Sequence, residues 1–228
     1  MSATSITTII FDLDGTLVDT APDLIAVADE MLAELQAGPL DAGQGRLAAG
    51  QGARALLTLG LQAAGRPLPG EDAWPALIED FIARYQARMT ALSRPFEGVP
   101  ELLQRLADAG LTMSVCTNKR TELAEELLRA LDLRAHFAAI VGGDSLPEKK
   151  PHPAPVEHAA SLASAKPHQA LMLGDSHADI TAAKAAGSLP VLAAWGYVRE
   201  PLAGYGAASI CHHPAELESL LRHFIAGT

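Results

Sequence analysis

Short apolar runs alternate with helical patterns over most of the chain. Residues 6–11 are almost entirely apolar and predict a buried strand, which Gly15 breaks shortly after its last apolar residue. The later predicted strands are 111–116, 138–141, 170–173, 190–194 and 207–211. The helices predicted between and after them are 99–109, 121–131, 153–164, 177–186 and 214–225. This alternation predicts an α/β fold with a doubly wound, mostly parallel sheet.

Residues 17–93 have a different pattern, in which no strand is expected. Apolar residues recur at helical spacing from Leu24 to Leu35, from Leu47 to Leu61 and from Trp74 to Tyr85. We therefore expect an inserted helical domain at 17–93 and a core domain made of 1–16 and 94–228.

Composition and charge narrow the range of partners. The 228-residue chain is 49% apolar, which is enough for a real core. Its formal net charge of −10 argues against nonspecific binding to nucleic acid or an anionic membrane, because both need a cationic face. No apolar stretch is long enough to span a bilayer, and no signal-peptide pattern is visible. Cys116 and Cys211 are expected to be reduced thiols. These features predict a cytoplasmic protein.

Charged and hydroxyl side chains come after four of the predicted strands, near the point where each strand ends. In chain order they are Asp12 and Asp14, Thr117 and Asn118, Lys149 and Lys150, and Asp175 and Asp179. Ligands of open α/β sheets bind outside the carboxyl ends of the strands. The sequence therefore predicts one site at that edge of the sheet.

This set of groups suits phosphoryl transfer. One carboxylate can attack phosphorus and form an aspartyl-phosphate. A second carboxylic acid can protonate the leaving oxygen and later take a proton from water. Mg²⁺ and a lysine neutralise phosphate oxygens, and a hydroxyl with backbone N–H groups at a helix start holds the phosphate. Mg²⁺ takes only one or two carboxylates besides waters and phosphate oxygens, which suits Asp12 and Asp175 with the Asp14 carbonyl.

The string from Phe11 to Thr20 resembles the first motif of the haloacid dehalogenase (HAD) superfamily of phosphohydrolases. The polar segments after the three later strands resemble the other motifs of this superfamily, in the same order. The resemblance covers essentially the whole chain and implies a Rossmann-like core with an inserted helical cap. It implies that Asp12 is the nucleophile and a metal ligand. Asp14 would be the general acid/base and offer its carbonyl to the metal, and Lys150 would contact both nucleophile and phosphate.

The same resemblance implies roles for the residues of the second and fourth motifs. Thr117, with the Asn118 amide, would bind the phosphoryl group. Asp175 would be the carboxylate ligand of Mg²⁺, and Asp179 a supporting acid.

Within the superfamily, the strings 94–103, 115–119 and 141–144 look most like those of bacterial phosphoglycolate phosphatases. His152 departs from this pattern, because these relatives usually carry Asp there. The change alters a local charge but removes no assigned role.

The segment 50–54 interrupts the helical pattern of the insert and resembles the specificity loop of the family. Phosphoglycolate carries a carboxylate, so Arg54 or the backbone N–H of Gly52 is a candidate partner for it. The alternative is a plain turn between helices.

We expect a Mg²⁺-dependent phosphomonoesterase, monomeric or homodimeric, that acts on a small phosphorylated metabolite, 2-phosphoglycolate. The alternatives are the same chemistry on a sugar phosphate such as N-acetylmuramic acid 6-phosphate, on a nucleotide or on pyrophosphate, and a phosphomutase. A noncatalytic phosphate binder is disfavoured because it has no need for both Asp12 and Asp14. A haloacid dehalogenase is disfavoured because its reaction has no phosphate charge to neutralise.

Other reactive side chains are expected to be structural. Cys116 reads as a small core residue, and Lys119, Arg120 and Lys149 read as surface cations. His177 is expected to be structural or exposed rather than part of the site.

Overall fold

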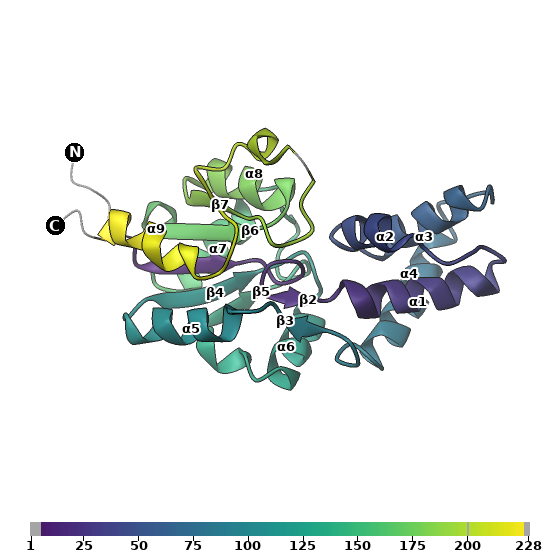
Figure 1. Ribbon diagram of the computed structural model, residues 1–228, viewed down its shortest axis with the longest axis horizontal. Coiled ribbons are helices and arrows are strands. Elements are labelled where there is room, and N and C mark those ends of the chain that lie inside the picture. Colours follow the sequence, from purple (N-terminus) through teal and green to yellow (C-terminus); the bar gives the residue numbers. More distant parts are fainter. Residues whose placement is uncertain (1–5, 200, 226–228) are drawn as a thin grey trace. The chain divides into compact units, whose positions relative to one another are not determined.

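The chain forms two compact units, as Figure 1 shows. The computed structural model describes residues 6–199 and 201–225. One unit, here called the inserted unit, is Asp19–Arg94. The described residues before and after it form the other unit, here called the core unit.

The core unit is built on a parallel sheet, which has six strands within the described residues. Their order is β5 (Ala139–Val141), β4 (Thr112–Cys116), β1 (Thr8–Phe11), β6 (Ala170–Gly174), β7 (Leu189–Ala193) and β8 (Ser209–Cys211). The central strands are short and almost wholly apolar, because helices cover both faces of the sheet. The predicted doubly wound, mostly parallel fold is confirmed.

One face of the sheet is covered by α7 (Ala154–Leu162) and α8 (His177–Ala186). Side chains from four strands pack there against small residues of the two helices, and this cluster comprises Ile10, Cys116, Val141, Val156, Ala159, Ala160, Ala170, Met172, Ala182 and Ala183. Helices α5 (Val99–Asp108) and α6 (Thr121–Ala130) pack against β4 and β5 from the other side (Figure 1). The final helix, α9 (Glu216–Ile225), is joined to α5 by the ion pair between Arg105 and Glu218.

The strand order places β1 where the chain reverses direction across the sheet. From β1 the chain passes to β4 and β5 on one side, then returns to β6 on the other side. Phe11 is in register with Val115 of β4 and Leu173 of β6. Residues directly after these three strands therefore meet at one level. Such a switch point is where parallel α/β sheets bind ligands.

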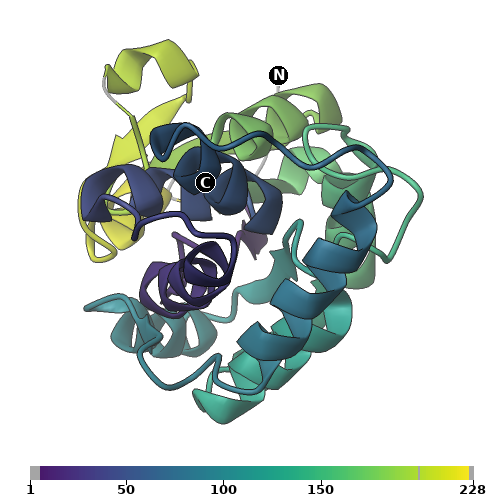
Figure 2. The ribbon, with the colours of Figure 1, turned by 90° about the vertical axis from the view of Figure 1, so that its right-hand side faces the viewer.

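The inserted unit is helical, with α1 (Ala21–Glu34), α2 (Ala42–Ala49), α3 (Ala53–Ala63) and α4 (Trp74–Gln86). Helix α1 packs against the other three helices, which Figures 1 and 2 show in purple to blue. Gly60 lets α3 approach α1 closely, since a Cβ at this position would overlap the side chain of Leu32. Leu56, Leu57, Phe81 and Tyr85 are buried in this unit.

Two-residue strands lie where the chain leaves the core unit and where it returns. They are β2 (Val18–Asp19) and β3 (Arg94–Pro95), which pair with each other. The sequence does not predict them, because two residues are too few to show a period. Within the described ranges, none of the helices combines the length and apolarity that a membrane crossing requires.

Candidate active site

The loop after β1 presents two of the expected carboxylates. Asp12 is buried, and its backbone N–H donates to the Leu173 carbonyl of the neighbouring strand, 2.9 Å away. Gly15 then turns the chain with a φ of 85°, which favours glycine. A Cβ at Gly15 would also overlap the carboxylate of Asp175. This close approach brings the loop after β1 together with Asp175, which belongs to the fourth motif of the sequence.

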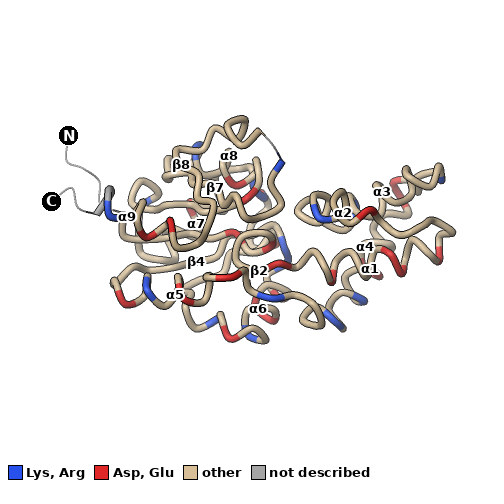
Figure 3. Tube along the Cα trace, viewed as in Figure 1, with Lys and Arg blue, Asp and Glu red and all other residues tan. Residues whose placement is uncertain are grey.

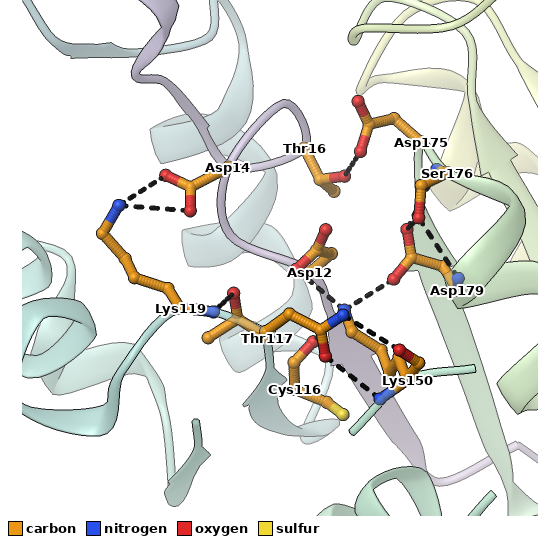
Figure 4. A network of polar contacts seen from close by, with 11 residues as sticks. Asp12, Asp14, Thr16, Cys116, Thr117, Lys119, Lys150, Asp175, Ser176 and Asp179 are labelled. Atoms are coloured by element: carbon orange, nitrogen blue, oxygen red, sulfur yellow. Dashed lines mark hydrogen bonds and ion pairs between the residues drawn. The ribbon is translucent and has the colours of Figure 1, made fainter. Parts of the chain in front are cut away.

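Lys150 is the buried cation at the centre of the site (Figure 4). Its Nζ lies 2.9 Å from Oδ1 of Asp12 and donates to Oδ1 of Asp179, 2.6 Å away. It also donates to the backbone carbonyl of Cys116, at 2.6 Å. Burial disfavours the ammonium, but Asp12 and Asp179 outweigh that penalty and raise the pKa of Lys150 above its ordinary value. Lys150 therefore stays charged between two carboxylates.

Asn118 holds the backbone of Lys150 in place. Its side-chain amide donates to the Lys150 carbonyl at 3.0 Å and accepts from the Lys150 backbone N–H at 3.0 Å. The loop after β4 and the loop after β5 are thus joined by two hydrogen bonds at the catalytic lysine expected from sequence. The sequence interpretation gave Asn118 only a phosphate-binding role, and this clamp was missed because it depends on a contact 32 residues away.

Thr117 lies directly after β4 and is buried. Its backbone N–H donates to the Val141 carbonyl at 2.9 Å. Its Oγ1 accepts a hydrogen bond from the backbone N–H of Lys119, at 3.2 Å. The hydroxyl is therefore held in the loop at the edge of the sheet that carries Asp12 (Figure 4).

Asp175 lies directly after β6 and is fixed by the loop after β7. Its Oδ2 accepts from the backbone N–H of Tyr197 at 2.7 Å, and its Oδ1 accepts from the hydroxyl of Thr16 at 3.3 Å. Trp195 donates from Nε1 to the Thr16 carbonyl at 3.0 Å. A Cβ at Gly196 would overlap both the carbonyl of Gly15 and the side chain of Asp175. The sequence reasoning missed residues 195–197, although they come after a predicted strand at the same edge.

Asp179 is fully buried and is held by the first turn of α8. Its Oδ2 accepts from the backbone N–H and the hydroxyl of Ser176, at 2.9 and 2.6 Å. Its Oδ1 accepts from Lys150. Both oxygens of Asp179 therefore already have donors, and one of these donors is the ammonium of Lys150.

The carboxylates outnumber the cations at the centre of this site. Oxygens of Asp12, Asp175 and Asp179 lie within 4.8 Å of one another, with the single ammonium of Lys150 beside them. Burial, with a further contribution from Asp179, raises the pKa of Asp12 to about 7, although Lys150 lowers it. Burial and the Asp12 charge raise the pKa of Asp175 well above its usual value. An added positive charge would relieve this imbalance.

The donor set fits a divalent cation. Oδ1 of Asp12 is buried and, apart from its ion pair with Lys150, has no hydrogen-bond partner, so it has a lone pair available. Carboxylate oxygens are the ligands that hard cations such as Mg²⁺ prefer. Asp12 and Asp175 would hold such an ion, because the oxygens of Asp179 are already engaged with Ser176 and Lys150.

Lys119 is the residue for which the sequence expectation of a surface cation is wrong. Its Nζ lies 3.0 and 3.2 Å from the two carboxylate oxygens of Asp14. Its side chain is only 8% exposed. The sequence gave no sign of this pairing, since the two residues lie 105 positions apart.

Arg54 and Gly52 belong to the inserted unit, where both already have partners. Arg54 forms a two-pronged ion pair with Glu71 and lies over the ring of Trp74, 4.7 Å from its centroid. The N–H of Gly52 donates to the Ala49 carbonyl at 3.1 Å. A substrate carboxylate at either group would have to replace these contacts.

The two remaining reactive side chains near the motifs have local contacts. His177 stacks on Tyr205 with parallel rings 4.0 Å apart. Burial raises the pKa of Cys116 to about 12, so its thiol is no nucleophile at neutral pH.

The buried carboxylate cluster and the lysine at the switch point of a parallel α/β sheet are groups that phosphoryl transfer needs. A family model described as haloacid dehalogenase-like hydrolase matches residues 9–193. The chain belongs to this family, and the phosphatases among its relatives identify it as a phosphatase.

Three relatives illustrate the similarity. A phosphoglycolate phosphatase from Caulobacter vibrioides is 45% identical over 205 residues, covering 90% of this chain and 86% of that protein. An N-acetylmuramic acid 6-phosphate phosphatase from Pseudomonas aeruginosa is 36% identical over 215 residues, covering 93% of both. A crystal structure described as a predicted phosphoglycolate phosphatase from Haemophilus somnus 129PT superimposes with a TM-score of 0.85 at 31% identity, covering 94% of this chain and 97% of that one.

Proposed function

We propose that this phosphatase hydrolyses 2-phosphoglycolate to glycolate and phosphate, with Mg²⁺ as cofactor and an aspartyl-phosphate on Asp12 as intermediate. The observation that carries the reaction type is the contact of the buried Asp12 carboxylate with Lys150, beside Asp175. The substrate rests on similarity to phosphoglycolate phosphatases at 39–45% identity.

Asp12 is the nucleophile in this proposal. One of its oxygens attacks phosphorus, and the bond from phosphorus to the ester oxygen breaks. Asp14 gives its proton to the departing ester oxygen and then removes a proton from the water that hydrolyses the aspartyl-phosphate. Asp14 suits this task because it lies two residues from the nucleophile, in the loop turned by Gly15.

The remaining core residues hold the phosphoryl group. Lys150 touches the nucleophile and neutralises the charge that develops on the phosphate oxygens. Thr117 supplies a hydroxyl, and the Asn118 amide at the approach to α6 supplies a backbone donor. Asp179 keeps the Lys150 ammonium in place through the contact at 2.6 Å.

Asp12, Asp175 and the Asp14 carbonyl would hold a divalent ion, which would supply positive charge between the carboxylate nucleophile and the anionic substrate. The Asp12 oxygen that lacks a hydrogen bond and the raised pKa of Asp175 support this assignment. The contacts of Tyr197 and Thr16 fix the orientation of Asp175 for the same purpose.

The inserted unit acts as a cap in this proposal, and Arg54 with the neighbouring Gly52 selects the substrate carboxylate. The guanidinium of Arg54 is half-exposed and forms a bidentate pair with the carboxylate of Glu71, and a substrate carboxylate could be bound in the same way. Arg54→Ala is expected to raise the KM for 2-phosphoglycolate, and Glu71→Gln to lower it because Arg54 loses its internal partner.

A second substrate has a specific observation in its favour. The relative from Pseudomonas aeruginosa named for N-acetylmuramic acid 6-phosphate matches the chain at 36% identity over 93% of its length. Both substrates are phosphate monoesters that carry a carboxylate. The proposed core chemistry is the same for either one.

Catalytic efficiencies on a panel of phosphate compounds test the substrate proposal. The panel contains 2-phosphoglycolate, N-acetylmuramic acid 6-phosphate, glucose 6-phosphate, a nucleoside monophosphate and pyrophosphate. We expect kcat/KM to be highest for 2-phosphoglycolate. Another compound at the head of the ranking would reject this substrate and leave the phosphatase chemistry standing.

Asp12→Asn and chelation test the chemistry itself. The substitution removes the nucleophile and is expected to lower kcat by at least about 10⁴-fold. EDTA should abolish phosphate release, and added MgCl₂ should restore it. MgCl₂ should also raise the melting temperature of the wild type but not of Asp175→Asn. Unchanged turnover in Asp12→Asn would refute the proposed intermediate.

A further inference from the structure

Lys119 forms an ion pair with Asp14, and the proposed reaction assigns no role to this lysine. The ammonium contacts both carboxylate oxygens, and the two side chains are 8% and 19% exposed. In Figure 4 the Asp14 carboxylate points away from Asp12 and toward Lys119. The cation that is next to the general acid/base is thus Lys119 and not the central Lys150.

The backbone of Lys119 is anchored on two sides. Its N–H donates to Oγ1 of Thr117 at 3.2 Å, and its carbonyl accepts from the N–H of Gly143 at 2.8 Å. A Cβ at Gly143 would overlap the neighbouring carbonyl of Asn118, so the two loops are in close contact here. The side chain of Lys119 therefore starts from a fixed point at the edge of the sheet.

The backbone of Asp14 is fixed as well. It forms a bridge with Val18, and the N–H of Gly15 donates to the Val18 carbonyl at 2.9 Å. With both backbones held, the contacts at 3.0 and 3.2 Å restrict the side-chain torsions of Asp14. A carboxylic acid that gives a proton to a leaving group must be closely aligned with it, since a misplacement of about 1 Å can slow a reaction about 10²-fold.

We propose that Lys119 is a positioning residue, which aims the carboxyl group of Asp14 at the leaving-group oxygen. The inference rests on the proposed function, in which Asp14 is the general acid/base. In the first step the bond from Asp12 oxygen to phosphorus forms and the ester bond breaks. The electron pair of that bond stays on the ester oxygen, which takes the proton of Asp14. Lys119 keeps its own proton throughout.

Leaving groups of different basicity separate positioning from other roles. An alkyl phosphate such as 2-phosphoglycolate releases a basic alkoxide and depends on the proton of Asp14. 2,4-Dinitrophenyl phosphate releases a stable phenolate and depends on that proton far less. Both esters share the remaining requirements, and kcat/KM reports the steps up to loss of the leaving group. The ratio of the two kcat/KM values therefore measures proton delivery.

Lys119→Met removes the ammonium and keeps the length of the side chain. We expect kcat/KM for 2-phosphoglycolate to fall about 100-fold and that for 2,4-dinitrophenyl phosphate to fall less than about 5-fold. Lys119→Arg restores a cation and should recover part of the ratio. Lys149→Met is the matched control, since Lys149 is an exposed lysine in the loop that carries Lys150, and it should leave both values unchanged.

Equal losses on both esters in Lys119→Met would overturn the inference and indicate a structural role. A rise confined to the KM for 2-phosphoglycolate, with kcat unchanged, would also overturn it and make Lys119 a binding group for the substrate carboxylate. If the wild type hydrolyses another alkyl phosphate of the panel better, that ester replaces 2-phosphoglycolate. Hydrolysis of neither ester by the wild type would reject the proposed function itself, and the inference with it.

Discussion

The core unit and the inserted unit both contain networks of ion pairs, but the ion pairs around Lys150 in the core unit are buried and those around Arg84 in the inserted unit are exposed. In the core unit the side chain of Lys150 is 2% exposed and that of its partner Asp179 is fully buried. In the inserted unit Arg84 joins α4 to α1 through Glu34, and these side chains are 25% and 58% exposed. Figure 3 shows both signs of charge on these two helices. The distances are similar, at 2.6 and 2.7 Å.

Equal geometry therefore does not mean equal consequences. Removing one member of a buried pair leaves a charge that water cannot reach, whereas an exposed partner is hydrated at once. The buried pairs of the core unit surround the proposed nucleophile, and the exposed pairs of the inserted unit lie between helices already packed by apolar residues. The comparison predicts that the core pairs control both stability and activity, and that the exposed pairs of Arg84 contribute little to stability.

The largest effect is expected for Lys150→Met in the core unit. The substitution leaves Asp12 and Asp179 facing each other without their cation, so the free energy of unfolding should fall by about 3–5 kcal/mol. Activity should fall by at least about 10³-fold, because the phosphate oxygens lose their neutralising charge. Urea denaturation and steady-state kinetics measure the two effects.

The double variant Lys150→Met with Asp179→Asn separates these two losses. It removes one of the stranded carboxylates, so part of the stability should return while activity stays lost. If stability and activity return together, or if the single variant is as stable as the wild type, the distinction between buried and exposed pairs breaks down.

A smaller effect is expected for Asp23 of α1, which is a buried acid inside the inserted unit. Its carboxylate accepts from the backbone N–H groups of Leu92 and Ser93, at 3.0 and 2.7 Å, and from the Ser93 hydroxyl at 2.7 Å. Asp23→Ala leaves these donors unsatisfied, so the free energy of unfolding should fall by about 2–3 kcal/mol in urea denaturation. This result would mean that the loss of stability depends on whether the charged group is buried and not on which of the two units contains it.

Ser93→Ala is the matched control for Asp23→Ala. It removes only the hydroxyl donor and keeps both backbone contacts with the carboxylate, so the loss should be about 1 kcal/mol. A loss as large as that of Asp23→Ala would place the stabilising effect in the packing of Ser93 and not in the carboxylate.

Local sequence patterns explain which parts of the fold and of the candidate site could be predicted from the sequence. The parallel sheet was predicted because buried strands are short apolar runs, such as the one that ends at Phe11, between periodic helices. Asp12 and Asp175 were chosen as candidates because they come directly after such runs, and Lys150 was chosen because of the surrounding motif. The structure brings these residues together, as the positions of the strand ends require.

Contacts between distant side chains could not be predicted, because no period or motif encodes them. Lys119 carries the same charge as the exposed Lys149, and only the fold brings it to Asp14. The side chain of Asn118 contacts the backbone of Lys150, and the backbone N–H of Tyr197 contacts Asp175. Contacts in which one partner is a backbone group leave no trace in the composition of the sequence. The two-residue strands β2 and β3 were not predicted for a different reason, because they are too short to show a period.

The smallest effect is expected for Arg84→Ala, which tests the exposed side of the comparison. Arg84 contacts Glu30 and Glu34 of α1 as well as Asp80 of its own helix. These carboxylates stay hydrated when the guanidinium is removed, so the shift in melting temperature should be less than half of that caused by Asp23→Ala. Salt screens exposed pairs, so even this shift should shrink in 1 M NaCl, whereas the shift of Asp23→Ala should persist. Equal, salt-insensitive shifts in both variants would mean that this network stabilises the helix pair as strongly as a buried carboxylate does.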